Sequence, residues 1–269
     1  MNTAERHMLD LLKRGREYYG FVAVKAEFEA EGTRPDELLR LLELAHRADL
    51  GVALKIGGCE AVSDLLQSRN YGANYIIAPM VETPYALSKF VEAKDKVYGK
   101  NEEGTEFLFN LETQTTLENL AKMVPVAKQG GIDGIVFGRV DFTLSRSMPR
   151  GAINDPSVTK AVMDVAVACA ENDLDLVVGG SVAVEAVPAL ARFRSVRLDR
   201  FETRKVVFDG SAAVSDTIAL GIATAVDFEL AWLRNKHEYY SRIAGEDLAR
   251  IQMMEERQAS RAQLAAVAR

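Results

Sequence analysis

FLFNLETQTTLENLAKMVPVAKQGGIDGIVFGRVDFTLS, residues 107–145, contains the pattern that decides the fold. Two short apolar runs, FLFNL and GIVFG, each lead into a loop that carries a carboxylate, Glu112 or Asp141. The segment between them predicts an amphipathic helix over 116–128. Buried strands joined by a helix are typical of a parallel sheet that is covered by helices. We therefore expect Glu112 and Asp141 at the ends of neighbouring strands.

The same alternation of apolar strand and amphipathic helix covers most of the chain. The predicted strands are 21–29, 51–58, 73–82, 107–111, 134–137, 174–180 and 200–209. We count seven strand and helix units, whereas a closed (β/α)8 TIM-type barrel has eight. The fold class is therefore α/β, a barrel in which one strand is atypical or missing from this assignment.

The composition fits one large globular domain with a small-molecule or protein partner. The chain has 269 residues, of which 48% are hydrophobic and 27% charged, with a formal net charge of −6 and a pI near 5.3. An acidic chain with interspersed basic residues argues against binding to nucleic acid or to an anionic membrane. Cys59 and Cys169 lack metal-ligand spacing, which favours a reducing compartment. The sequence has no signal peptide or membrane span, so we expect a cytoplasmic protein.

Three regions follow from these patterns. An N-terminal helix lies within 1–20, the barrel covers 21–212, and a helical extension covers 213–269. The extension is either a pair of surface helices or an arm that packs on a neighbouring subunit. We expect a homo-oligomer, because one barrel is too small to cover the extension's large apolar side chains. These are Trp232, Tyr239, Tyr240, Met253 and Met254.

Glu112 and Asp141 suit a divalent cation. Two hard carboxylate ligands at neighbouring strand ends favour Mg²⁺ or Mn²⁺ and leave coordination positions open for a substrate. The alternatives are structural: Glu112 as a helix N-cap or loop ion pair, and Asp141 as a helix cap.

Three motifs, IIAPMVETPYAL, FLFNLET and GIVFGRVDFT, occur in that order. Together they resemble the HpcH/HpaI aldolase and citrate lyase β-subunit family of (β/α)8 barrels, over residues 22–209. The resemblance implies a divalent-metal-dependent aldolase or carbon–carbon lyase that acts on a 2-oxo acid through a pyruvate-type enolate. It implies Glu112 and Asp141 as metal ligands. It also implies that the loop from Gly138 binds the 2-oxo acid carboxylate through the amides of Val140 and Asp141.

The sequence departs from the family pattern at two positions. Lys55 stands where family aldolases carry an arginine that binds the substrate, and a lysine lacks the guanidinium fork. Gly32 stands where they carry a histidine that works as a base. The base would then be Glu29, Glu31, a metal-bound water or the substrate itself.

Two cations have more than one interpretation. Lys55 binds substrate oxygens, forms a Schiff base, or makes a structural ion pair. Arg139 meets a phosphate or second carboxylate of the substrate, or it forms a salt bridge at a subunit interface. Lys25, two residues before Glu27, is predicted to be its structural partner.

The sequence therefore favours a class II pyruvate-type aldolase. Two other functions remain open. One is a condensing enzyme of the same superfamily that forms a carbon–carbon bond in a biosynthetic pathway. The other is a non-catalytic barrel that binds a ligand, in which case no metal would bind tightly.

Overall fold

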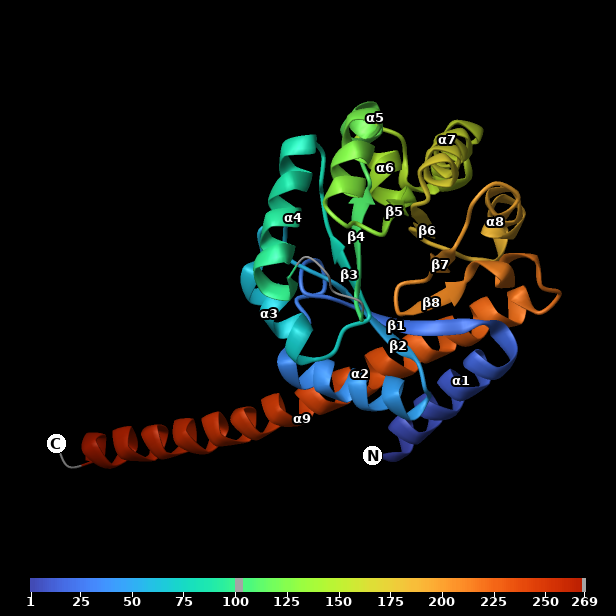
Figure 1. Cartoon of the computed structure of the whole chain (residues 1–269). Coiled ribbons are helices and arrows are strands. Elements are labelled where there is room, and N and C mark those ends of the chain that lie inside the picture. The colour runs from blue at the N-terminus through green and yellow to red at the C-terminus, as the bar shows by residue number, and fades with distance from the viewer. Residues whose placement is uncertain (100–103, 268–269) are drawn as a thin grey trace.

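The computed structural model describes residues 1–99 and 104–267, with side chains described up to residue 261. Eight strands close into a barrel in chain order, and helices surround it (Figure 1). The expected α/β barrel is thereby confirmed. The strands are β1 (Phe21–Glu27), β2 (Gly51–Lys55), β3 (Tyr75–Ala78), β4 (Glu106–Leu111), β5 (Gly134–Gly138), β6 (Asp175–Gly179), β7 (Arg200–Glu202) and β8 (Val206–Asp209). The α-helices are α1 (Thr3–Tyr19), α2 (Pro35–Arg47), α3 (Val62–Asn70), α4 (Pro84–Tyr98), α5 (Gln114–Gln129), α6 (Arg139–Ser145), α7 (Pro156–Asn172), α8 (Val187–Arg194) and α9 (Ile218–Val267).

The eighth strand is the atypical one. Residues 200–209, predicted as one strand, form two: β7 runs parallel to β6, and β8 runs antiparallel to both β7 and β1. The prediction of a single strand is wrong because apolar residues continue on both sides of the turn and do not mark the reversal. The hairpin replaces a strand and helix unit. It also brings its three turn residues, Thr203, Arg204 and Lys205, to the end of the barrel where the parallel strands finish.

The interior of the barrel is a packed apolar layer. Its residues are at most 3% exposed: Ala23, Ala53, Ile77, Leu108, Val136, Val177 and Val207. Small and branched side chains from facing strands fill the space, so the barrel is a core and not a pore. Polar chemistry is therefore confined to the two ends of the barrel.

The segment after β5 differs from the prediction of a loop. It begins with the short helix α6 and continues through the 3₁₀ helix Arg150–Asn154 before α7. Seven residues are too few for helical periodicity to be recognised in the sequence. The consequence for the site is that Asp141 lies on the first turn of a helix.

The C-terminal extension is one helix of 50 residues rather than a pair. Its first half packs along α1, and its second half projects away from the barrel (Figure 1). Phe228 and Trp232 are 0% and 5% exposed within their own chain. Tyr240 donates a hydrogen bond to Glu37 of α2 at 2.8 Å. The expectation that Trp232 and Tyr240 need a second subunit to cover them is therefore wrong. Residues 268–269 of the extension lie outside the described part of the chain.

None of the helices in the described residues has an apolar stretch long enough to cross a bilayer.

Candidate active site at the barrel mouth

The carboxyl ends of strands β1 to β7 form one mouth of the barrel, and charged side chains fill it. The mouth is the face on which barrel enzymes carry their chemistry. Its ion pairs join four cations to five carboxylates, namely Lys25, Lys55, Arg204 and Lys205 with Glu27, Glu29, Glu31, Glu112 and Glu202.

Glu112 lies at the centre of this group. It follows β4, is 1% exposed, and is therefore held entirely by protein contacts. Its Oε1 accepts a hydrogen bond from the backbone amide of Met80 at 3.0 Å, and its Oε2 accepts one from the side-chain amide of Asn110 at 2.6 Å. Met80 has a φ of 50°, a left-handed conformation that is costly for a residue with a side chain. A strained backbone therefore orients the Glu112 carboxylate.

Lys55 bridges two carboxylates at the mouth. It ends β2, is 7% exposed, and its Nζ lies 3.4 Å from Glu112 Oε2 and 3.2 Å from Glu29 Oε2. Pairing between Lys55 and a site carboxylate is the structural interpretation that the sequence left open.

Glu29 and Glu31 have different surroundings. Both oxygens of Glu31 are engaged, Oε1 by Arg204 at 3.1 Å and Oε2 by Lys205. Glu29 Oε2 is buried beside Lys55 yet accepts no hydrogen bond among the described residues. Of the two candidate bases, Glu29 has fewer partners among the described residues than Glu31.

Lys25 is the structural partner of Glu27, as predicted, with 3.3 Å between Nζ and Oε1. It also bonds Glu202 at the end of β7, a residue that the sequence analysis missed. Burial alone would raise the pKa of Glu27, but the charges of Lys25, Lys55 and Arg204 outweigh it and hold the pKa below its ordinary value. A recurring signal could have found Glu202: an apolar residue followed by Glu-Thr occurs at 81–83, 111–113 and 201–203.

The loop from Gly138 to Asp141 packs against the end of β4. A Cβ built on Gly138 would lie 2.9 Å from Glu112 Cβ and 3.1 Å from its Oε2, so glycine allows the loop to pack closely against that carboxylate. Asp141 is half-buried on the first turn of α6. Neither carboxylate caps a helix, because Thr113 caps α5 and Gly138 precedes α6. The capping interpretations of Glu112 and Asp141 are therefore wrong.

Gly180 holds the same loop from the β6 side. Its φ is +85°, and a Cβ there would lie 2.7 Å from the Val140 nitrogen and 2.8 Å from the Arg139 nitrogen. Only glycine tolerates both the conformation and the close approach.

Arg139 is 1% exposed and binds protein groups. It donates hydrogen bonds to the carbonyls of Gly179 and Gly180 at 3.1 and 3.0 Å, and to Asn154 at 3.1 Å. Burial lowers its pKa to about 10, so the guanidinium still carries its charge at neutral pH. A role for Arg139 in substrate binding stays a prediction, and its three partners favour a structural role that ties β5 to β6.

The donor atoms at the mouth fit a divalent cation. Within the described residues no group of three or more metal-ligating side chains comes together, so the assignment of Glu112 and Asp141 as metal ligands stays a prediction. Two buried oxygens at the mouth, Glu29 Oε2 and Asn110 Oδ1, accept no hydrogen bond from the described residues. Carboxylates outnumber cations in the ion-pair group even before Asp141 is counted. Hard oxygen donors with excess negative charge are what Mg²⁺ and Mn²⁺ require.

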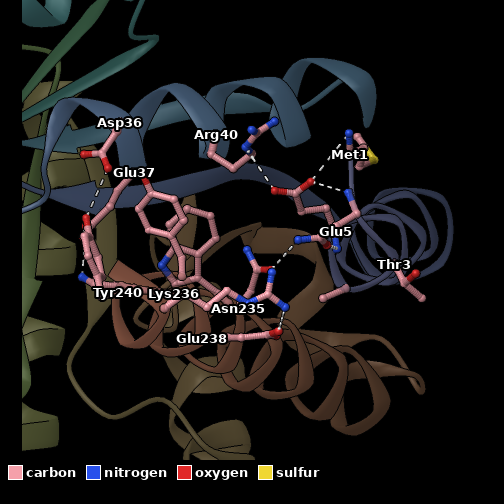
Figure 2. A pocket seen from close by; sticks show the side chains of 15 residues that line it. Met1, Thr3, Glu5, Asp36, Glu37, Arg40, Asn235, Lys236, Glu238 and Tyr240 are labelled. Atoms are coloured by element: carbon pink, nitrogen blue, oxygen red, sulfur yellow. Dashed lines mark hydrogen bonds and ion pairs between the residues drawn. The ribbon is translucent and has the colours of Figure 1, made fainter. Parts of the chain in front are cut away.

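A separate cavity lies on the outer flank of the barrel. It has a volume of about 620 Å³ and is lined by α1, α2 and α9 (Figure 2). Its buried carboxylates are already paired, Glu5 with Arg40 at 3.1 Å and Glu37 with Lys236 at 3.0 Å. The charged groups of the cavity therefore bind one another, although Trp232, which lines it, lies 5.9 Å from the Lys205 ammonium of the mouth.

Comparison with known proteins identifies the family of the chain. The family model described as HpcH/HpaI aldolase/citrate lyase matches residues 43–194, which include Lys55, Glu112 and Asp141. No protein of curated function matches the sequence.

An HpcH/HpaI aldolase from Desulfitobacterium hafniense DCB-2 has a similar structure, with a TM-score of 0.57 and 14% identity over 82% of this chain and 87% of that one. An HpcH/HpaI aldolase/citrate lyase family protein from Burkholderia cenocepacia J2315 gives a TM-score of 0.60 and 13% identity, over 89% of this chain and 90% of that one. These structural similarities support the fold, and the match over more than half of the sequence establishes the family. The chain belongs to the HpcH/HpaI aldolase/citrate lyase family.

Proposed function

We propose that this chain is a carbon–carbon lyase of the pyruvate aldolase type, which cleaves a 2-oxo acid at the bond that leaves a pyruvate-type enolate. The observation that carries the proposal is the position of Lys55, whose buried ammonium pairs with both Glu112 and Glu29 at the carboxyl ends of the strands. Positive charge, a candidate base and hard oxygen ligands meet there. The same residues serve bond formation in the reverse direction.

Glu112 and Asp141 would hold Mg²⁺ or Mn²⁺. When bound, the cation supplies Lewis-acid stabilisation of the negative charge that develops on the keto oxygen as the bond breaks. The contacts from Met80 and Asn110 support this role, because they fix the Glu112 carboxylate before any ligand arrives.

Lys55 and the loop after β5 would bind the 2-oxo acid. The Lys55 ammonium offers a compact charge to a carboxylate or keto oxygen. The amides of Val140 and Asp141, at the start of α6, offer hydrogen bonds to the substrate carboxylate. Gly180 supports them by packing directly against the Val140 nitrogen.

Glu29 would handle the proton. In the cleavage direction its carboxylate takes the proton of the hydroxyl on the carbon that becomes the aldehyde. The carbon–carbon bond then breaks, its electron pair remains on the 2-oxo acid fragment as the enolate, and a proton returned to the methylene carbon gives the 2-oxo acid. Each turnover therefore consumes no proton overall.

The experiment that tests this function needs no knowledge of the aldehyde. Protein with Mn²⁺ or Mg²⁺ and pyruvate in heavy water should exchange the pyruvate methyl protons for deuterium, observed by proton NMR. Chelation of the metal and the substitution Glu112→Gln should each stop the exchange, whereas Asp133→Asn, at the opposite end of the barrel, should not. No exchange by the metal-loaded wild type, or equal exchange by Glu112→Gln, would contradict the proposal.

A further inference from the structure

The tight turn between β7 and β8 carries two cations to the mouth of the barrel. The amide of Thr203 donates a hydrogen bond to the carbonyl of Val206 at 2.9 Å, which leaves Arg204 and Lys205 as the two corner residues. The reversed strand β8 pairs with β1, and the Lys25 amide donates to the Lys205 carbonyl at 2.9 Å. The turn therefore lies directly beside the carboxyl-terminal half of β1.

The loop that follows β1 has few backbone contacts of its own. It covers residues 28–34, and backbone hydrogen bonds hold its two ends, where the amides of Phe28 and Thr33 donate at 2.8 and 3.1 Å. Within the part of the chain that the structure describes, the backbone groups of residues 29–32 make no hydrogen bond to other backbone groups. The position of this middle segment, which includes Glu29, therefore depends on side chains.

Glu31 is the side chain that attaches this segment to the barrel. Its Oε1 accepts a hydrogen bond from Arg204 Nε at 3.1 Å, and its Oε2 accepts one from Lys205 Nζ. The Arg204 side chain is 51% exposed, so water screens its charge, whereas Lys205 is 4% exposed. The ring of Trp232 in α9 lies 5.9 Å from the same ammonium and adds a cation–π contact. A buried cation on a tight turn therefore holds Glu31 in place.

Glu29 lies two residues before this anchor. Its Oε2 is buried 3.2 Å from Lys55 Nζ and accepts no hydrogen bond among the described residues. The place of Glu29 beside Lys55 therefore depends on the course of the loop, which Glu31 fixes.

We propose that Lys205 is a positioning residue for the reaction at the mouth. Through Glu31 it holds the loop after β1 so that Glu29 meets the substrate, and Arg204 supports the same contact from the rim. The inference rests on the proposed function, in which Glu29 handles the proton. It makes Glu31 an anchor rather than a base.

The first test is limited proteolysis of the full-length chain with a protease that cleaves after glutamate. Lys205→Met keeps an unbranched side chain and removes the charge, which should free the loop and raise the rate of cleavage after Glu31 about tenfold. The matched control is Lys94→Met, which removes a lysine that is 2% exposed, pairs with Asp95 at 2.8 Å and lies 5.3 Å from the Phe107 ring. This control should leave cleavage after Glu31 at the wild-type rate. Equal cleavage there in the wild type and in Lys205→Met would overturn the proposal.

The second test is the exchange of pyruvate methyl protons for deuterium with Mn²⁺ present, which reports proton transfer. Lys205→Met should lower the turnover number about a hundredfold, as expected for a misplaced catalytic group, and leave the KM for pyruvate within about twofold. Glu31→Gln keeps the size of the side chain and should show the same pattern with a loss of about tenfold, so the test does not depend on one variant. Lys94→Met should exchange at the wild-type rate.

The third test asks whether Lys205 acts through Glu29. With Glu29→Gln as the background, the addition of Lys205→Met should change the remaining exchange by less than about twofold. A larger further loss, or a higher KM with an unchanged turnover number, would show a general structural or binding role and contradict the positioning role. Equal exchange by the wild type and Lys205→Met would contradict the positioning role alone, whereas no exchange by the wild type would contradict the proposed function and the positioning role together.

Discussion

Both ends of the barrel carry networks of charged side chains, and the two networks differ in how completely their oxygen atoms are paired with hydrogen-bond donors. At the amino ends of the strands, Arg200 donates to Glu106 and Asp175 at 2.6 and 2.8 Å, and its guanidinium lies 4.4 Å from the centre of the Tyr75 ring. Arg197 binds Asp175 and Asp199 at 2.9 and 2.7 Å. At this end the planar guanidinium groups of both arginines make several short contacts with carboxylates, which stabilise it.

At the carboxyl ends the central cation is a lysine with longer contacts. Lys55 lies 3.2 and 3.4 Å from its two carboxylates, and two buried oxygens, Glu29 Oε2 and Asn110 Oδ1, accept no hydrogen bond from the described residues. Unsatisfied buried groups are costly unless a ligand uses them. The amino end therefore stabilises the barrel, whereas the two unpaired oxygens at the carboxyl end support the proposal that a metal and a substrate bind there.

The largest effect should come from the proposed metal ligands. Glu112→Gln and Asp141→Asn each keep the shape of the side chain and remove a charge. Loss of several kcal/mol of charge stabilisation should lower turnover about a thousandfold, since each 1.36 kcal/mol is about a factor of ten. Calorimetry with Mn²⁺ should show much weaker binding for both variants. Unchanged metal affinity in both would show that the site is wrongly assigned.

The next effect should come from Lys55, and it separates two mechanisms. If Lys55 binds the 2-oxo acid by charge, Lys55→Ala should raise the KM about tenfold or more, whereas Lys55→Arg should keep appreciable activity. Chelators should abolish activity, and borohydride with substrate should trap nothing. A substrate adduct on the peptide that contains Lys55, with activity that survives chelation, would instead establish a Schiff base.

The unfolding free energy should depend strongly on the ion pairs at the amino end and only weakly on Glu29 at the mouth. Arg200→Met, at the amino end, should cost about 3 kcal/mol of unfolding free energy because it leaves Glu106 and Asp175 without that partner. Glu29→Gln, at the mouth, should change the unfolding free energy by less than about 0.5 kcal/mol and yet lower activity. Chemical denaturation measures both. An equal loss of stability in the two variants would remove the distinction drawn between the ends.

The smallest effect should be the pH dependence of stability, which has opposite signs at the two ends. The pKa of Glu27 in the folded protein lies below its ordinary 4.5, so its stabilising contribution is present above that pH and is lost as the pH falls. Burial raises the pKa of Asp133 above its ordinary 3.8, so its contribution is present at low pH and is lost as the pH rises. Glu27→Gln should therefore reduce the loss of stability in acid. Asp133→Asn should reduce the loss of stability that occurs as the pH rises towards neutral. Denaturation midpoints between about pH 3 and pH 7 would test both signs.

The sequence was sufficient for the parts of the fold that depend on local patterns. Apolar runs that alternate with amphipathic helices predicted strands β1 to β6 and the barrel, and α5 contains the predicted helix over 116–128. The prediction that Glu112 and Asp141 follow neighbouring strands is confirmed by the pairing of Leu111 in β4 with Phe137 in β5. These features were accessible because each depends on a few consecutive residues.

The sequence was not sufficient where distant segments meet. The pair of Lys25 and Glu202 joins residues 177 positions apart, and that of Glu31 and Lys205 joins residues 174 apart. The reversal between β7 and β8 lacks the glycine, asparagine or proline that usually marks a turn. Nothing in a local pattern distinguishes a continuous 50-residue α9 from two shorter helices.

The most direct measurement is a crystal structure of the protein grown with Mn²⁺ and pyruvate, with diffraction data collected near the manganese absorption edge. The account predicts an anomalous peak between Glu112 and Asp141, with the 2-oxo acid bound to it and within reach of Lys55. A peak at another place, or pyruvate bound at the mouth with no metal beside Glu112, would contradict it.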